Sequence, residues 1–177
     1  MQRTGRRAFT DDDEALIEPY IGMLRRFAIG LCHDSHLADD LVQDCLERAV
    51  SHWHMRHEDG NLKGWLFTIL HNEFASGRRR IARRGIMPSL EDLPIEPSAM
   101  ADQEENLRVQ DIMAAVGKLA DDHRALILLI AVEELTYEEA AQVLGVPIGT
   151  IMSRLSRARE KLRRLLRDEA PAINRLG

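Results

Sequence analysis

Aromatic residues, cysteines and long apolar runs are all scarce in this sequence. Of its 177 residues, four are Phe, two Trp, two Tyr and two Cys. No apolar run approaches the roughly 18 residues of a membrane span, and the stretch after Met1 lacks the apolar core of a signal peptide. We therefore expect a soluble, cytoplasmic protein. Cys32 and Cys45 both lie in amphipathic patterns, which favours reduced core thiols.

Motifs of catalysis and cofactor binding are missing as well. The sequence has no Gly-rich phosphate loop, no G-x-S-x-G elbow and no H-E-x-x-H pair. Histidines gather beside Cys32 and again between His52 and His57, but neither group is completed to four zinc ligands. We expect no enzymatic activity, no cofactor and no metal site.

The residues that are abundant favour helices. Leu, Ala, Arg and Glu are frequent and β-branched runs are few, which predicts an all-α protein. The net charge of −5 argues against a nucleic-acid binder, but the charges are unevenly placed. Five arginines and no acid lie between Arg78 and Arg84, and seven cations face only Glu160 between Arg154 and Arg167. The distribution of charge therefore allows local contact with nucleic acid.

Apolar periodicity predicts two groups of helices. The first group covers about Glu14–Leu31, His36–His52 and Leu62–Arg84, and the second begins near Leu107 and ends at Pro171. Three prolines and a run of acids separate the groups. We expect two small helical domains, an N-terminal bundle and a C-terminal helix-turn-helix domain, joined by a flexible acidic linker. The predicted parts are a tail (1–13), the first domain (14–85), the linker (86–106), the second domain (107–170) and a tail (171–177).

The sequence from Thr136 to Arg167 is the most specific pattern. Thr136 and Glu139 fit a capping box, Gly145 fits a left-handed helix end, and Pro147 can open the next helix. In that helix the apolar residues from Ile148 onward are expected to face inward. Thr150, Ser153, Arg154 and Arg157 form a row on the opposite face, which suits a helix in a DNA major groove. The alternative is a helical hairpin with a solvated basic face.

Two helices of the first group carry further candidates. One has Leu37 and Val50 among its predicted buried residues, and an opposite face with acids from Asp39 to Glu47. Such a face is usually only solvated. The other helix follows an aromatic-rich loop and ends in arginines, which suits single-stranded nucleic acid. Aromatic residues at helical spacing are more often core, so both interpretations stay open.

Three stretches resemble a known family in their order along the chain. Residues 135–162, LTYEEAAQVLGVPIGTIMSRLSRAREKL, resemble the promoter-reading domain of bacterial extracytoplasmic-function (ECF) sigma factors. Residues 38–46, ADDLVQDCL, resemble their clamp-binding helix, and residues 64–72, GWLFTILHN, resemble their promoter-melting helix. The resemblance covers about Glu14 to Leu166.

The resemblance implies a function and three sets of site residues. The chain would bind core RNA polymerase, through its largest and second-largest subunits, and direct initiation at specific promoters. It would also have an anti-sigma factor as partner. The polymerase-binding set is Asp39, Asp40, Leu41, Gln43, Asp44 and Glu47. The set for the minus-ten element is Arg56, Asn61, Lys63, Trp65, Phe67, His71, Asn72, Arg78, Arg79 and Arg80. The set for the minus-thirty-five element is Thr150, Ser153, Arg154, Ser156, Arg157 and Arg159.

Two other functions would use the same helix-turn-helix. A stand-alone regulator would bind duplex DNA without polymerase, but it leaves the acidic helix and the Trp65 helix without a role. A sigma mimic would titrate an anti-sigma factor, and such mimics usually carry a receiver domain for which this chain has no room.

Overall fold

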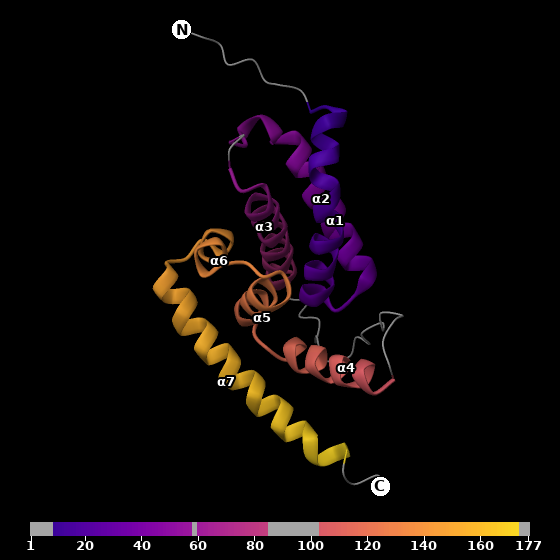
Figure 1. Ribbon diagram of the computed structural model, residues 1–177, viewed down its shortest axis with the longest axis vertical. Coiled ribbons are helices and arrows are strands. Elements are labelled where there is room, and N and C mark those ends of the chain that lie inside the picture. The colour runs from indigo at the N-terminus through magenta and orange to yellow at the C-terminus, as the bar shows by residue number, and fades with distance from the viewer. Residues whose placement is uncertain (1–8, 58–59, 85–102, 174–177) are drawn as a thin grey trace.

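The computed structural model describes residues 9–57, 60–84 and 103–173, and the elements within these ranges are all helical (Figure 1). The fold class is therefore all-α, as predicted. The predicted linker falls outside the described residues from 86 to 102. The elements in chain order are α1 (Asp11–Cys32), α2 (Ser35–Ser51), η1 (Trp53–Met55), α3 (Leu62–Arg83), α4 (Gln103–Gly117), α5 (Asp121–Ile127), η3 (Leu128–Val132), α6 (Tyr137–Leu144) and α7 (Ile148–Ile173).

Side-chain caps explain where the first three helices begin. The Asp13 carboxylate accepts hydrogen bonds from the Thr10 amide and hydroxyl, so α1 begins at Asp11, three residues earlier than predicted. Asp34 accepts from the Leu37 amide at the start of α2, and Asn61 accepts from the Gly64 amide at the start of α3. The predicted tail of residues 1–13 is therefore wrong at its C-terminal end.

The helix-turn-helix forms as the sequence predicts. Thr136 and Glu139 make a reciprocal capping box, and Gly145 ends α6 with φ 63°, in the left-handed region. Helix α7 begins at Ile148, directly after Pro147. It ends at Ile173, two residues beyond the predicted end at Pro171; the proline removes one i→i−4 hydrogen bond, and only two helical residues follow it. Likewise α4 begins at Gln103, so residues 103–106 are helix and not linker.

Three apolar residues that were predicted to be buried are exposed. Leu37 is 55% exposed, Val50 41% and Ile148 38%, since each lies at the edge of its helix's apolar stripe. No pattern in the sequence indicates that the helix from Asp121 continues as the short π-helix η3. That π-helix leads into Glu133 and into Glu134, which has φ 55°.

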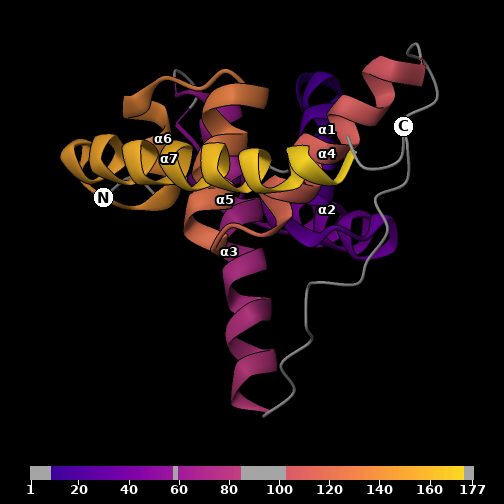
Figure 2. The same ribbon diagram turned by 90° about the horizontal axis from the view of Figure 1, so that it is seen from below.

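The two groups of helices share one hydrophobic core. The α1–α3 group is built around Leu24, Phe27 and Phe67, all fully buried, and the C-terminal group around Leu126, Leu129 and Ile151. Helix α3 packs on α6, and α1 packs on α4 and α5 (Figures 1 and 2). The N-terminal half (α1–α3) and the C-terminal half (α4–α7) are thus in contact through α1 and α3.

Both cysteines are free, as predicted. Burial raises the pKa of the Cys32 thiol to about 11 and that of the Cys45 thiol to about 12, so both stay protonated near neutral pH. No helix within the described ranges is long and apolar enough to cross a membrane.

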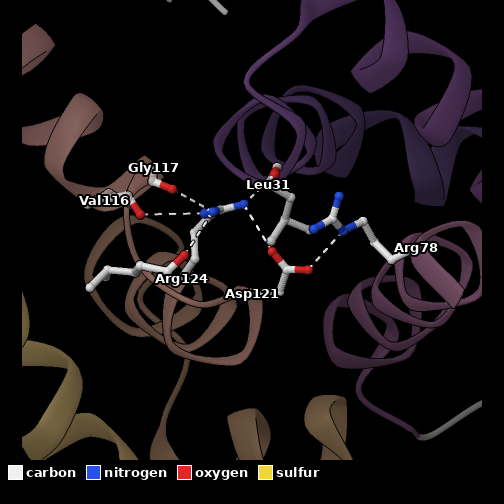
Figure 3. Close-up of polar contacts among 7 residues, drawn as sticks. Leu31, Arg78, Val116, Gly117, Asp121 and Arg124 are labelled. Atoms are coloured by element: carbon white, nitrogen blue, oxygen red, sulfur yellow. Dashed lines mark hydrogen bonds and ion pairs between the residues drawn. The ribbon is translucent and has the colours of Figure 1, made fainter. Parts of the chain in front are cut away.

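A buried arginine of α5 joins the two halves (Figure 3). Arg124 is 2% exposed and donates to backbone carbonyls of both halves as well as to the Asp121 carboxylate. The carbonyls belong to Leu31 (3.0 Å), Val116 (3.4 Å), Gly117 (2.6 Å) and Leu119 (2.8 Å). The end of α1 is thereby fixed against the end of α4.

His33 lies beside this arginine, in the interface between the halves. It ends α1 with φ 54°, and its ring contacts the backbone of Gly117 so closely that a Cβ there would lie 2.8 Å from Cε1. Its Nε2 is buried without a hydrogen-bond partner among the described residues. Burial, with Arg124 nearby, lowers the pKa of His33 to about 4.

This arrangement predicts a pH-dependent stability. In the unfolded chain His33 is protonated as the pH falls below its ordinary pKa of 6.5. In the folded chain it stays neutral until about pH 4, because its pKa is lowered. The histidine should therefore remove about 2 kcal/mol of unfolding free energy between about pH 7 and about pH 5. His33→Asn, which tolerates the left-handed backbone, should lose that share of the pH dependence in urea unfolding. Parallel pH profiles for the two proteins would contradict the assignment.

Candidate nucleic-acid interface

The predicted polymerase-binding residues lie on one exposed face of α2. Asp39, Asp40, Gln43, Asp44 and Glu47 are all exposed, and we call them the α2 acidic face. Asp39 accepts from Arg25 Nε at 2.6 Å, and this hydrogen bond lowers the pKa of its carboxyl group. Gln43 donates to Glu47 at 2.9 Å. Leu41, the sixth predicted member, is only 9% exposed and packs in the core.

The aromatic residues near the start of α3 pack mainly on one another. Trp53 meets Phe9 edge-to-face at 5.2 Å and Trp65 at 5.8 Å, and the Arg56 guanidinium lies 4.5 Å from the Trp53 ring centre. Phe67 is fully buried against Phe27. Trp53 and Phe67 are therefore core residues, which agrees with the interpretation that aromatic residues at helical spacing pack in the core. Trp65 is half-buried and Arg56 is at the surface of the cluster.

A hollow of about 360 Å³ lies between α2 and α3. It brings Asn72 and Arg80, both predicted for the minus-ten element, together with Arg48, Ile69, Glu73 and Ser76. Arg48 Nη1 lies 2.8 Å from Glu73 Oε1, so the acid beside Asn72 is neutralised. Sequence reasoning missed Arg48 and Ser76; the spacing of Asn72, Ser76 and Arg80 along one helix face could have indicated Ser76.

Three of the predicted minus-ten residues are bonded to the C-terminal half. Asn61 donates to Glu139 Oε1 at 2.6 Å, and Lys63 donates to the backbone carbonyl of Glu133. Arg78 Nε lies 2.9 Å from Asp121 Oδ2 (Figure 3). These three contacts run along α3 from its N-cap to its C-terminal turns, and we call them the α3 latch.

The acceptor side of the α3 latch is acidic and partly buried. The Glu133 side chain is fully buried beside Arg26, whose Nη2 is 3.2 Å from Oε2. Burial nevertheless raises the pKa of Glu133, and its Oε1 has no partner among the described residues. Glu139 has a lowered pKa, first because of the hydrogen bond from the Thr136 amide. Elsewhere on α3, burial lowers the pKa of His71, whose Nδ1 is likewise unpartnered among these residues.

The predicted minus-thirty-five residues line the outer face of α7. Ser153, Ser156, Arg157 and Arg159 are exposed, whereas Thr150 is half-buried. Arg154 turns back toward α5, where its Nη1 lies 3.1 Å from Asp122 Oδ2. Ile151, Leu155 and Ala158 hold the opposite face of the helix in the core. The arrangement presents hydroxyls and guanidinium groups to a partner, as a groove-reading helix would.

A metal site requires a particular arrangement of ligand side chains. Within the three described ranges, no group of three or more His, Cys, Asp or Glu side chains is arranged to hold a metal ion.

Family models match both halves of the chain. Residues 17–71 match the model described as the Sigma2 domain of PhyR, and residues 109–162 match Sigma-70, region 4. Among curated relatives, the ECF RNA polymerase sigma factor EcfG of Rhodopseudomonas palustris is 38% identical over 143 residues, which are 81% of this chain and 78% of that protein. SigE of Mycolicibacterium smegmatis, another ECF sigma factor, is 30% identical over 90% of this chain and 63% of its own length.

Solved structures give the same result. The sigma factor RpoE of Bartonella quintana, solved with the anti-sigma factor NepR, superimposes with a TM-score of 0.76 at 37% identity, covering 89% of this chain and 98% of that one. CnrH, solved with the cytosolic domain of CnrY, gives a TM-score of 0.65 at 27% identity and covers 88% of each chain. The anti-anti-sigma factor PhyR of Bartonella quintana shares the fold at 17% identity, with a TM-score of 0.57 over 84% of this chain and 48% of that one.

The α3 latch can be tested through its ion pair. Arg78→Ala removes the Arg78–Asp121 pair, which is about one-third exposed on both sides, and should lower the unfolding free energy by about 1 kcal/mol. The neighbouring Arg79→Ala is the matched control, because the hydrogen bond of Arg79 lies within its own helix, to Ser76. Equal urea midpoints for the two variants would contradict a role of Arg78 in joining the halves.

Proposed function

We propose how the surfaces described above divide the work of a chain that belongs to the ECF RNA polymerase sigma factors. It is an alternative sigma factor that directs transcription initiation. The observation that carries this conclusion is the 38% identity with an ECF sigma factor across 81% of the chain, which spans both halves.

Two domains with separate tasks are part of this proposal. Residues 14–85 form a domain for polymerase clamp binding and minus-ten melting, and residues 107–170 form the domain for the minus-thirty-five element. The described helices support a small adjustment, because α1 begins at Asp11 and α4 at Gln103. Such a factor, without catalysis of its own, acts in the cytoplasm beside the polymerase.

The α2 acidic face is the proposed contact with the polymerase largest subunit. Its support is the exposure of five polar side chains on one helix, with carboxylates that can meet a basic coiled coil. Leu41 contributes indirectly, by packing the helix onto the core.

The loop before α3 and the exposed side of α3 are the proposed minus-ten site. Five of its predicted residues are exposed or half-buried while the α3 latch is closed, namely Arg56, Trp65, Asn72, Arg79 and Arg80. The hollow beside Asn72 is the proposed place for a nucleotide. Phe67 supports this site from the core and does not stack on a base. His71 lines the same helix from a half-buried position.

Asn61, Lys63 and Arg78 reach DNA only after the α3 latch opens. Their donors are directed at the Glu139 and Asp121 carboxylates and at the Glu133 backbone carbonyl, so they are already bonded within the chain. We therefore propose that the two halves separate when polymerase binds.

The outer face of α7 is the proposed reader of the minus-thirty-five duplex. Ser153, Ser156 and Arg157 are presented directly, and Arg159 lies one turn further along. Arg154 must leave Asp122 to reach a phosphate or a base edge.

An anti-sigma factor completes the set of proposed partners. RpoE was solved with the anti-sigma factor NepR and CnrH with the cytosolic domain of CnrY, and both resemble this chain along most of its length. An inhibitor that binds both halves at once would keep the α3 latch closed.

Start-site mapping with core polymerase separates this function from its rivals. Run-off transcription on a genomic fragment library should give start sites that share two upstream elements. A stand-alone regulator would bind one duplex element tightly without polymerase and give no start sites. A mimic of the PhyR kind would bind an anti-sigma factor and also give none.

The α2 acidic face predicts a loss of polymerase binding without loss of folding. Asp40→Ala combined with Gln43→Ala should reduce co-purification with core polymerase about tenfold or more, because both side chains are exposed parts of the proposed contact. Glu18→Ala, which removes an exposed acid from α1, is the control. Unchanged polymerase binding by the double variant would count against the assignment.

A further inference from the structure

One long apolar side chain interrupts the polar face of α7. Met152 is 53% exposed and is flanked in sequence by Ser153 and in space, one turn on, by Ser156. The core beneath α7 is already filled by Ile151 and Leu155, which are 0% and 3% exposed. Met152 therefore contributes little to folding and presents a thioether and methyl group to solvent.

The space beside Met152 is open. A hollow of about 240 Å³ lies between the start of α6 and α7, lined by Tyr137, Met152, Leu155, Ser156, Arg159 and Arg163. The side chain consequently has room to change rotamer, and methionine is flexible enough to follow the shape of a partner. A partner of this face must also offer negative charge or hydrogen-bond acceptors, because Arg157, Arg159 and Arg163 are all exposed around it.

Duplex DNA offers one apolar group among its polar base edges. In the major groove only thymine carries a C5-methyl group, and apolar side chains distinguish it by contact. Resting on the proposed minus-thirty-five function of α7, we propose that Met152 contacts the C5-methyl group of a thymine in the upstream element. The serines and Arg157 read polar edges around it, so Met152 adds selectivity for thymine at one position.

The test replaces thymine by uracil, which removes only the methyl group. Holoenzyme of core polymerase and the full chain initiates on the mapped promoter, with each upstream thymine changed in turn to deoxyuridine. At one position the wild-type protein should initiate about three- to fivefold less well, the size expected for one lost methyl contact. Met152→Ala should show that loss already on the thymine template and no further loss on uracil.

Two control variants sharpen the result. Met152→Leu keeps an apolar side chain and should retain most of the methyl sensitivity. Val132→Ala removes a comparably exposed apolar side chain from the same half and should keep the wild-type profile. Since Met152 is exposed, its alanine variant should unfold at the wild-type urea concentration.

The outcomes distinguish this proposal from the function on which it rests. A scrambled upstream element should abolish the effect of Met152→Ala. If scrambling leaves wild-type initiation unchanged, the minus-thirty-five function itself fails. If scrambling matters but no uracil position does, or Met152→Ala remains methyl-sensitive, the thymine contact is overturned. An equal loss by Met152→Ala on every template would also overturn it, and would place Met152 against a protein.

Discussion

The burial of the Arg124 guanidinium is the constraint on which the arrangement of the two halves depends. A charge taken out of water must be met by acceptors, and removing one of them is costly. Arg124 meets this demand with four backbone carbonyls, three from the end of α4 and its turn and one from the end of α1, together with Asp121. Asp121 in turn binds Arg78 (Figure 3), so one buried cation sets the positions of α1, α3 and α5 relative to α4. His33 closes the same junction in its neutral form.

This junction has a consequence for the residues of α3 that we propose to bind DNA. Residues of α3 that we propose to contact promoter DNA bond to acceptors of the other half while the α3 latch is closed, among them Asn61 with Glu139 and Lys63 with the Glu133 carbonyl. The same donors can serve an internal partner or DNA, but not both at once. Each exposed contact is weak. Separation of the halves also breaks the buried hydrogen bond from Arg124 to the Leu31 carbonyl and divides the shared core, so these buried contacts set most of the free energy that polymerase binding must supply. The net charge of −5 is compatible with DNA binding, because the cations are concentrated on α7 and at the end of α3.

Much of this was predictable because it depends on local sequence. The capping box at Thr136, the glycine turn and the helix periods fix α6, α7 and the first three helices to within a few residues. The resemblance to ECF sigma factors predicted the order of the proposed polymerase-binding, minus-ten and minus-thirty-five surfaces along the chain. The latch was not predictable, since Asn61 and Glu139 lie 78 positions apart and neither shows its partner in a local pattern. The burial of Phe67 was missed for the same reason, because periodicity cannot tell a buried ring from an exposed one when Phe27 comes from another helix. The π-helix η3 has no sequence signal that we recognise.

The exchange of latch contacts for polymerase and DNA is tested most directly by the distance between the halves. Cysteines placed at exposed Ser51 on α2 and Gln142 on α6 can carry a donor and an acceptor dye, while Cys32 and Cys45 stay protonated and react slowly. We expect high energy transfer in the free protein and in a complex with an anti-sigma factor. We expect a large fall when core polymerase is added, before any DNA. Unchanged transfer in a holoenzyme that initiates transcription would contradict the opening of the α3 latch.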